Sequence, residues 1–379
     1  MLVVSGIWPP DVGGPASHGP AIGRFLAGRH HEVRAVVSGE HPEPAGFPVQ
    51  VLRRDRPLPE RMARGFTGLV GATRWPQVVY STGMYHRTAI ACTLTRTPLV
   101  IKLTSDPAYD RARNRGWFSG TLEAFQASPG DRRVDALKAV RDRALRRADS
   151  VLIPSRYLAA MAREWSLDAS RVHVVPNPAD LPAPSASREA LRERFSMTGP
   201  TAVYIGRFAL AKSVLTLVEA AAAVPGLAVV LIGDGPEREA LQARIETLGL
   251  AGRVRLHPSV DRAGVADWFH AADLSVLPSQ WENFPHGVVE SLSVGTPVVA
   301  SDVGGVSEIL EEDAYGRLVT AGAADDLARA MGGLIEETGT LAAMRAAAAV
   351  AGARYRPDAV FGQIEAAVER AASTRLSRT

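Results

Sequence analysis

Cysteine is almost missing from this sequence: Cys92 is the only one in 379 residues. A single cysteine cannot form an internal disulfide, and this usage fits a reducing compartment. Long apolar runs are missing too. The nearest candidate, residues 220–232, is interrupted by Pro225 and Gly226 and falls short of the roughly 20 residues that span a bilayer. Residues 1–7 are apolar but follow no basic segment, unlike a secretion signal. We therefore expect a cytoplasmic protein.

Two kinds of ligand motif are also missing. No Asp-x-Asp sequence follows a candidate strand, and no His/Cys cluster has the spacing of metal ligands. We therefore expect neither a metal nor another cofactor. The first glycine-containing loop, residues 6–14, lacks the Gly-x-Gly-x-x-Gly spacing of dinucleotide sites, which disfavours a nicotinamide-dependent dehydrogenase.

The sequence has little excess of charge of either sign, because positive and negative residues nearly balance and the formal net charge is only +3. Most of the excess lies within residues 111–147, where ten arginines and lysines lie close together. This stretch is either a solvated helical face or a surface that meets anionic lipid headgroups or a phosphorylated acceptor. The second alternative would place the protein at the inner face of the membrane as a peripheral protein. Nucleic acid is not an expected partner, since no aromatic residues are interleaved for base stacking.

Short apolar, β-branched runs alternate with amphipathic helical stretches along the chain. Such a pattern predicts an α/β protein with parallel sheets covered on both faces. The candidate strands are 2–5, 32–37, 78–81, 99–103, 150–153, 172–175, 202–205, 228–232, 254–256, 274–277, 298–300 and 316–319. Helical patterns between them include 21–29, 135–147, 214–223, 238–248 and 265–271.

A proline-rich segment, residues 178–187, divides the two series of strands. Three prolines without apolar periodicity predict a linker. We expect an N-terminal domain over residues 1–180 and a C-terminal domain over 198–355. Residues 356–379 form a further helix that caps the N-terminal domain or crosses back to it. Two doubly wound domains joined by a hinge imply a central cleft, with ligands beyond the carboxyl ends of the strands.

The segment Gly206-Arg-Phe-Ala-Leu-Ala-Lys212 follows one of these strands and precedes a helix that begins near Ser213. Glycine lets backbone approach a ligand, and the first turn of a helix offers free N–H groups and a positive dipole end. Arg207 and Lys212 add two cations suited to a diphosphate. The alternative is an ordinary turn with two surface cations.

Two glutamates lie eight positions apart in Glu282-Asn-Phe-Pro-His-Gly-Val-Val-Glu290. Glu282 is expected in a loop after the strand 274–277, and Glu290 about one turn into the next helix. A loop carboxylate can accept hydrogen bonds from sugar hydroxyls, and a helical carboxylate can hold both hydroxyls of a ribose. The alternative is a capping glutamate followed by an ordinary helical one.

The same glutamates begin a longer pattern, Ser291-Leu-Ser-Val-Gly-Thr-Pro-Val-Val-Ala-Ser-Asp-Val-Gly-Gly-Val-Ser-Glu308. Together they resemble the signature of the retaining glycosyltransferases of family 4. The resemblance extends, in the expected order, to Trp8–Ala16, Val175-Pro-Asn-Pro178, Tyr204-Ile-Gly-Arg207, Ile232-Gly-Asp-Gly-Pro236 and Ala272–Ser279. It implies the GT-B fold, in which two Rossmann-like domains face a central cleft, the first binding the acceptor and the second a nucleotide sugar.

The resemblance also implies roles for individual residues. Arg207 and Lys212 would hold the donor diphosphate, and Glu290 would hold the ribose. Glu282 would bind the transferred sugar together with the backbone of the next residues. The loop at Val260 would lie beside the base, and the first loop would close over the phosphates. The implied donor-binding residues are Gly13, Gly14, Arg207, Lys212, Val260, Glu282, Asn283, Phe284, Pro285 and Glu290.

One position departs from the family pattern. Many members carry a histidine after the fourth N-terminal strand, whereas this chain has Lys102-Leu-Thr-Ser-Asp106. Asp106 either contacts the acceptor or a sugar hydroxyl, or it caps a helix. His18, Tyr85 and His86 are further acceptor-side candidates, expected on N-terminal loops that face the cleft. The three N-terminal loops that would shape the acceptor pocket are 39–48, 53–71 and 109–131.

The expected activity is transfer of a hexose from a UDP- or GDP-sugar to an acceptor hydroxyl, with uracil favoured as the base. Candidate catalytic residues are Arg207, Lys212, Glu282 and Asp106. The resemblance implies metal-independent front-face attack, with the acceptor a small molecule or lipid-linked. Two alternatives remain: a nucleotide-sugar 2-epimerase on the same fold, and a non-catalytic nucleotide-sugar-binding module.

Overall fold

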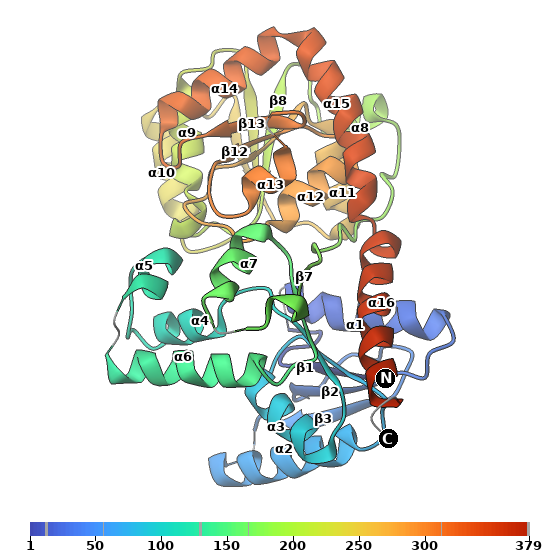
Figure 1. Ribbon diagram of the computed structural model, residues 1–379. Coiled ribbons are helices and arrows are strands. Elements are labelled where there is room, and N and C mark those ends of the chain that lie inside the picture. Colours follow the sequence, from blue (N-terminus) through green and yellow to red (C-terminus); the bar gives the residue numbers. More distant parts are fainter. Residues whose placement is uncertain (12–13, 56, 129–130, 166, 312, 377–379) are drawn as a thin grey trace. The chain divides into compact units, whose positions relative to one another are not determined.

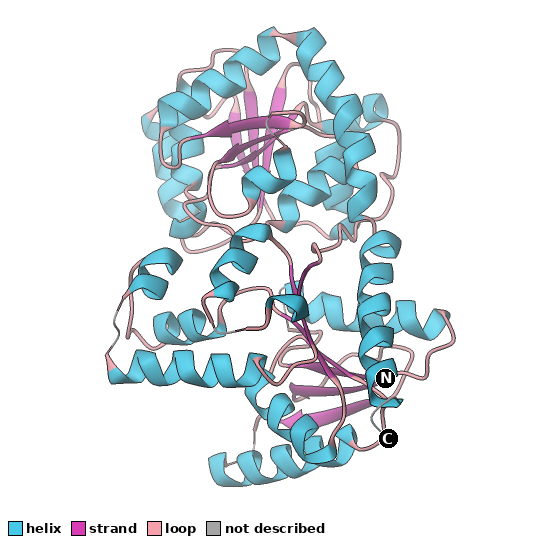
Figure 2. Cartoon of the chain, in the orientation of Figure 1, coloured by secondary structure: helices cyan, strands magenta, loops and turns pink. Residues whose placement is uncertain are grey.

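A computed structural model describes residues 1–11, 14–55, 57–128, 131–165, 167–311 and 313–376, without the side chains of residues 14–15, 58 and 374–376. The chain forms two compact units. The first comprises Met1–Pro176 together with Phe361–Thr379, and the second comprises Asn177–Val360. Each unit has a parallel sheet between helices (Figures 1 and 2).

The sheet of the first unit has the order β3-β2-β1-β4-β5-β6-β7, and every neighbouring pair is parallel. β1, β5 and β6 are buried along their whole length, as expected for parallel strands with helices on both faces. The strands are β1 (Leu2–Ser5), β2 (Arg34–Gly39), β3 (Val49–Arg53), β4 (Val79–Ser81), β5 (Leu99–Lys102), β6 (Ser150–Ile153) and β7 (Val172–Val174).

Helices of the first unit begin at residues that favour a helix start. Thr121, Asp131 and Ser155 each accept a hydrogen bond from a backbone N–H of the helix that follows, which satisfies a donor that lacks a partner within the helix. The helices are α1 (Gly14–Gly28), α2 (Leu58–Thr73), α3 (Tyr85–Thr95), α4 (Pro107–Asn114), α5 (Leu122–Ala127), α6 (Arg132–Leu145), α7 (Arg156–Arg163) and, from Phe361 onward, α16 (Pro357–Leu376).

The second unit has a sheet of order β10-β9-β8-β11-β12-β13, again parallel throughout. Its strands are β8 (Thr201–Ile205), β9 (Ala228–Ile232), β10 (Val254–His257), β11 (Leu274–Leu277), β12 (Val298–Ser301) and β13 (Gly316–Val319). Its helices are α8 (Arg188–Arg194), α9 (Val214–Ala222), α10 (Arg238–Thr247), α11 (Arg262–Ala271), α12 (His286–Ser293), α13 (Val306–Leu310), α14 (Ala324–Glu336) and α15 (Thr338–Gly352).

Apolar side chains fill both faces of this second sheet. On one face, residues of α9, α10 and α14 pack in a single buried cluster with strand residues such as Leu231 and Val276. On the other face, one cluster includes Val288 of α12 and Ile309 of α13, and another includes Leu191 of α8 and Phe269 of α11. The sheet is therefore the middle layer of three, an arrangement typical of doubly wound α/β proteins.

Every strand expected from the sequence is present, with ends that differ by no more than two residues. β3 was missed because it is a half-exposed edge strand without a continuous apolar run. The prediction of loops is wrong for two segments. Residues 53–71 contain most of α2, and residues 109–131 contain part of α4 and all of α5. The segment around 178–198 contains α8, and the second unit begins at Asn177.

Candidate functional site

The carboxyl ends of β8 and β11 lie next to each other in the second sheet, where the strand order changes direction. β8 is followed in sequence by β9 on one side of it, whereas β11 lies on its other side. Loops from such adjacent strands run to opposite faces and leave room for a ligand between them. Arg207 follows β8 and Glu282 follows β11, so the two predicted motifs meet at this point.

The loop after β8 is held by backbone contacts. Gly206 N donates to the carbonyl of Ile232 (3.0 Å), and Phe208 N donates to that of Asp234 (2.9 Å). The Tyr204 hydroxyl donates to the Arg207 carbonyl (2.9 Å). Arg207 itself is exposed, and among the described residues its side chain forms no ion pair. A rigid backbone thus carries a cation that can reach a ligand.

Lys212 and Glu282 form an ion pair across the two loops. The Lys212 Nζ lies 2.5 Å from Glu282 Oε1, and the same oxygen accepts a 2.8 Å hydrogen bond from the Ser279 hydroxyl. The Glu282 side chain is 10% exposed and that of Lys212 is 34% exposed. Burial of Tyr204 raises the pKa of its hydroxyl, and the negative charge of Glu282 raises it further.

Further hydrogen bonds join these loops to each other and to the loop after β12. Gln280 N donates to the Ala211 carbonyl (2.9 Å), and its Nε2 donates to the Ser213 hydroxyl (2.8 Å). Gly305 N donates to the Asn283 carbonyl (3.1 Å). Glu282 is therefore positioned by three loops that are separated in the sequence, which sequence patterns alone do not reveal.

Residues Asn283, Phe284 and Pro285 are buried at the start of α12. The Phe284 ring packs edge-on against Tyr355, with 5.9 Å between ring centroids. Its carbonyl accepts a hydrogen bond from Asn177 Nδ2 (3.4 Å). Pro285 is the N-cap residue of α12 and has no backbone N–H to offer a ligand.

Glu290 lies in α12, as predicted, and its side chain is 8% exposed. Arg262 Nη1 donates to Glu290 Oε1 at 2.8 Å, and Nη2 donates to the Asp180 carbonyl. Arg262 is not among the site residues that the sequence predicts. A signal was available, because Arg262 lies two residues after Val260 in the loop already expected beside the base. Val260 is half-buried between β10 and α11.

The N-terminal candidates belong to the first unit. His18, Tyr85 and His86 were expected on loops, and this is wrong: His18 lies in α1, and the other two begin α3. His18 Nε2 is 2.8 Å from the Tyr80 hydroxyl. The Tyr85 hydroxyl reaches the carbonyls of Thr82 and Lys102, both at 3.0 Å, and burial raises its pKa.

The first loop is only partly described. Gly13 lies outside the described residues, and Gly14 is the first residue of α1. Their predicted approach to the donor phosphates stays a prediction.

Asp106 is buried and caps α4. Its Oδ1 accepts hydrogen bonds from the backbone N–H groups of Ala108 (2.8 Å) and Tyr109 (3.3 Å). Its Oδ2 accepts from Gln126 Nε2 (2.8 Å) and forms an ion pair with Arg141 Nη1 (2.5 Å). Both oxygens are thus engaged within the first unit, an arrangement typical of the helix-capping alternative.

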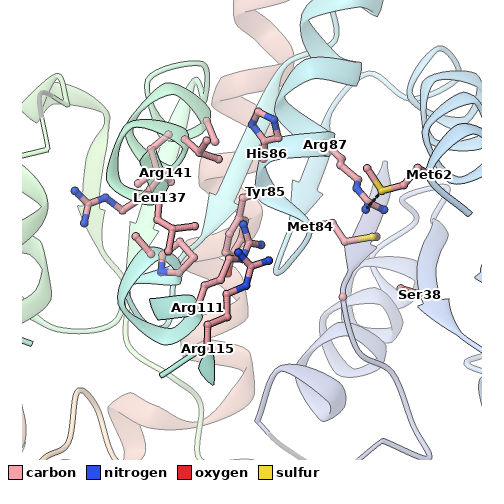
Figure 3. Close-up of a pocket in the computed structure, with 16 residues that line it drawn as sticks. Ser38, Met62, Met84, Tyr85, His86, Arg87, Arg111, Arg115, Leu137 and Arg141 are labelled. Atoms are coloured by element: carbon pink, nitrogen blue, oxygen red, sulfur yellow. Dashed lines mark hydrogen bonds between the residues drawn. The ribbon is translucent and has the colours of Figure 1, made fainter. Parts of the chain in front are cut away.

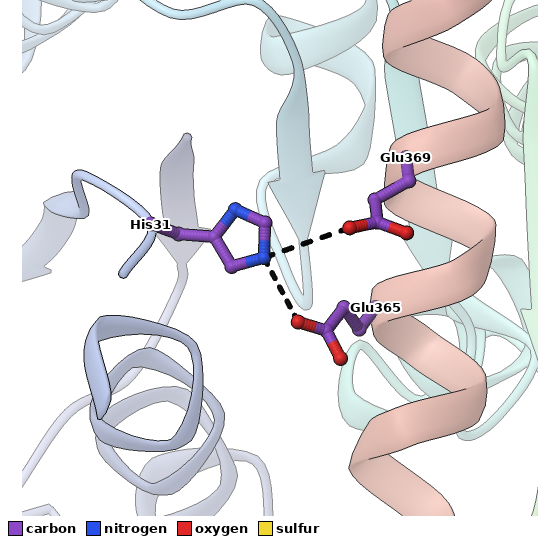
Figure 4. Close-up of side chains that lie close together, drawn as sticks. All are labelled: His31, Glu365 and Glu369. Atoms are coloured by element: carbon purple, nitrogen blue, oxygen red, sulfur yellow. Dashed lines mark hydrogen bonds and ion pairs between the residues drawn. The ribbon is translucent and has the colours of Figure 1, made fainter. Parts of the chain in front are cut away.

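A histidine and two glutamates of α16 come together in the first unit, although the histidine is far from both glutamates in the sequence. His31 Nε2 lies 2.9 Å from Glu365 Oε1 and 3.8 Å from Glu369 Oε1 of α16 (Figure 4). Such a group can in principle hold a metal ion, but Arg29 Nε also pairs with Glu365 at 2.8 Å. A cation already balances this carboxylate, so the arrangement suits an ion-pair tether better than a metal site.

None of the helices in the described ranges combines the length and the apolar character that a membrane crossing needs.

The fold and the site together define a two-unit α/β protein with cations and carboxylates at the switch point of its second sheet. Two family models match the chain: "Glycosyl transferase 4-like domain" over residues 13–178 and "Glycosyl transferases group 1" over residues 187–350. The chain belongs to the family-4 glycosyltransferases.

Curated relatives carry glycosyltransferase names. The chain is 34% identical over 209 residues to a D-inositol 3-phosphate glycosyltransferase of Xylanimonas cellulosilytica, covering 52% of this chain and 50% of the relative. It is 31% identical over 204 residues to an alpha-D-kanosaminyltransferase of Streptomyces kanamyceticus, covering 51% and 53%. The chain thus matches about half the length of each of these relatives.

Solved structures confirm the GT-B fold. Anabaena HepE in complex with UDP superposes with a TM-score of 0.80 at 22% identity, covering 98% of this chain and 100% of that one. Sucrose-phosphate synthase of Thermosynechococcus elongatus gives a TM-score of 0.78 at 19% identity, covering 98% and 99%.

Proposed function

We propose that the protein is a retaining glycosyltransferase that moves a hexose from a nucleoside-diphosphate sugar to an acceptor hydroxyl. The observation that supports this best is the grouping of Arg207, Lys212 and Glu282 at the switch point of the second sheet, with Glu290 in the following helix. Cations suited to a diphosphate and carboxylates suited to hydroxyls are both present there.

In this proposal, donor binding breaks the ion pair between Lys212 and Glu282, because the two side chains then bind different parts of the donor. Lys212 and Arg207 bind the diphosphate, while Glu282 accepts a hydrogen bond from a hydroxyl of the sugar. Glu290 accepts hydrogen bonds from the ribose diol in place of those from Arg262. UDP is the first nucleotide to test, because the Anabaena structure with the same fold holds UDP; GDP is the second.

The chemical step breaks the bond between the anomeric carbon and the diphosphate oxygen, and the electron pair leaves with the diphosphate. Arg207 and Lys212 stabilise that growing negative charge. The acceptor oxygen attacks from the face that the diphosphate leaves, and a phosphate oxygen takes the acceptor proton. Configuration at the anomeric carbon is thereby retained. Two fixed cations at the diphosphate make a divalent ion unnecessary, so activity should persist in EDTA.

Nucleotide-induced thermal stabilisation tests the donor site. At 100 times its dissociation constant, a nucleotide should add about 2.7 kcal/mol to the stability of the folded state. We expect this with UDP or UDP-glucose, and its loss in Arg207→Ala and Glu290→Gln. Arg329→Ala is the matched control, because that arginine is 77% exposed on α14 and pairs only with its neighbour Asp326 among the described residues. Equal stabilisation of all four proteins would contradict the proposal.

Product analysis separates the alternatives. Incubation with UDP-glucose and a panel of polyol and phosphorylated polyol acceptors should yield a new α-glycoside, identified from its anomeric proton. Formation of a C2 epimer without acceptor would indicate the epimerase. Nucleotide binding without any product would favour the non-catalytic module.

A further inference from the structure

The first unit contains a pocket of about 620 Å³, apart from the proposed donor site in the second unit. It opens at the carboxyl ends of β1 and β4, where the order of the first sheet changes direction. Gly6 follows β1, while Met84, Tyr85 and His86 follow β4, and all four line the pocket. Its volume lies in the range of small-molecule sites, about 300–1,000 Å³.

Arginines from three helices line this pocket: Arg87 of α3, Arg111 and Arg115 at the end of α4, and Arg141 of α6 (Figure 3). Only Arg141 is neutralised, by the buried Asp106. Arg87 Nη2 contacts the Met62 sulfur, a weak acceptor, and Arg115 lies over the Trp117 ring. Within the described ranges, none of Arg87, Arg111 and Arg115 pairs with a carboxylate.

Arg111 and Arg115 are four residues apart and so lie on one face of α4. Figure 3 shows both side chains extending toward Tyr85. The alternative interpretation is that these cations only offset the partial negative charge at the carboxyl end of the helix and bind no ligand. That effect does not require them to line a pocket, and Arg113 could serve it from the opposite face, where it lies over Tyr109.

His86 provides a second, independent observation. Its Nδ1 is buried and has no hydrogen-bond partner within the described part of the chain. Desolvation lowers the pKa of His86, as do the charges of Arg147, Arg111, Arg143 and Arg87. A buried polar atom without a partner is uncommon, and a neutral imidazole among arginines can form a hydrogen bond with a ligand at neutral pH.

We propose that this pocket binds a phosphate group carried by the acceptor, with Arg87, Arg111 and Arg115 as its ligands. The inference rests on the proposed transferase function, because it names the class of acceptor. A phosphate monoester carries a charge of about −1.5 to −2 at neutral pH, which suits three arginines without a counter-charge. Guanidinium groups bind phosphate oxygens in a bidentate manner. Met62, Met84 and Leu137 add apolar lining on opposite sides of the pocket, which suits the rest of the acceptor (Figure 3).

The same phosphate chemistry occurs in a free polyol phosphate and in a lipid headgroup. Two probes distinguish these sources: glycerol 3-phosphate in solution, and vesicles that contain phosphatidic acid in phosphatidylcholine. Saturable binding of glycerol 3-phosphate supports a soluble acceptor. Binding of the phosphatidic acid vesicles alone, without binding of pure phosphatidylcholine vesicles, supports a lipid acceptor.

The test follows the imidazole NMR signal of His86, assigned by its loss in His86→Gln, during titration with each probe. In the wild type we expect a saturable shift. In the double variant Arg111→Gln/Arg115→Gln, affinity should fall roughly tenfold or more, because two charge-assisted hydrogen-bonding groups are lost. Arg113→Gln, on the opposite face of α4, is the matched control and should bind like the wild type.

An unmoved His86 signal with both probes, or equal affinity in the double variant and the control, would overturn the inference. UDP titration of the same three proteins keeps this result separate from the donor site. If UDP stabilises all three while phosphate leaves His86 unmoved, only the acceptor inference fails. If phosphate shifts His86 and UDP binds to none of them, the proposed donor fails instead.

Discussion

Several ionisable residues near the ends of β4 and β5 are buried. Their side chains form hydrogen bonds with backbone groups and do not face solvent. Lys102 is 1% exposed, and its Nζ donates to the carbonyls of Val175 and Pro176. Asp106 accepts hydrogen bonds from backbone N–H groups in the first turn of α4, and it also forms an ion pair with Arg141. At the residue scale, each of these groups has a structural role that can be measured separately from turnover.

Replacement of Asp106 tests whether that residue is structural or catalytic. Asp106→Ala leaves Arg141 buried and charged, so we expect the free energy of unfolding to fall by about 3–5 kcal/mol in urea denaturation. Asp142→Ala is the control, because Asp142 contacts the same arginine from a more exposed position, and its loss should cost less. Unchanged stability together with lost turnover would make Asp106 catalytic.

Lys102 makes the stability of the folded first unit depend on pH. Burial lowers the pKa of Lys102 from 10.5 to about 7. Between these pH values the unfolded chain binds more protons than the folded one, so this residue makes stability rise with pH from about 7 to about 10. The urea midpoint of the wild type should therefore rise relative to that of Lys102→Met over this range. Parallel curves for the two proteins would contradict the expectation.

At the scale of elements, the proposed donor site depends on how closely the loops after β8 and β9 approach each other. Gly233 has φ +146°, and a Cβ there would lie 1.9 Å from the Gly206 carbonyl oxygen. Gly235 has φ +154°, and its Cβ would lie 2.3 Å from the Phe208 carbonyl oxygen. Two glycines in one loop thus fix the position of the loop that carries Arg207.

Gly233→Ala should displace that loop, since the clash is with backbone that cannot rotate away. We expect a loss of about 1–3 kcal/mol in the stability of the folded state from the strained backbone alone, together with weaker nucleotide binding in calorimetry. Gly333→Ala provides the comparison: nothing lies within 4 Å of a Cβ at that helical position, so stability should hold or rise slightly. Undiminished nucleotide affinity in Gly233→Ala would show that the approach is not needed for binding.

At the scale of the whole molecule, the chain leaves the first unit at Pro176 and returns to it at Phe361. The returning segment of α16 is fixed by Phe361, which packs against Phe25 and His18, and by Glu365, which pairs with Arg29 and His31. The described part of α16 from Phe361 onward therefore completes the first unit.

Glu365→Gln should loosen this segment, because it removes the charge that Arg29 and His31 share. Burial alone would raise the pKa of Glu365, but hydrogen bonds from His31 and Arg29 leave it lowered. The tether is therefore present at neutral pH and is lost as the pH falls through that lowered pKa. Faster amide hydrogen exchange over residues 361–373 in Glu365→Gln would report the loss. Glu369→Gln, which removes a carboxylate that is 59% exposed, should have a smaller effect; equal exchange in both variants would contradict the tether.

The sequence by itself determined the order of the elements and the two motifs at the proposed donor site. Continuous apolar strands are visible in a sequence because parallel strands are buried on both faces. Arg207, Lys212, Glu282 and Glu290 were identifiable because they lie in the loops and helices that directly follow two predicted strands, within motifs that resemble those of a known family.

Only the tertiary structure decided which distant residues meet. The pairs Arg262–Glu290, Arg141–Asp106 and His31–Glu365 join segments whose spacing carries no periodic signal. The arginine pocket likewise forms because α3, α4 and α6 converge at one edge of a sheet. Local patterns report the burial of an element, whereas the partners of a charged side chain depend on how the elements pack.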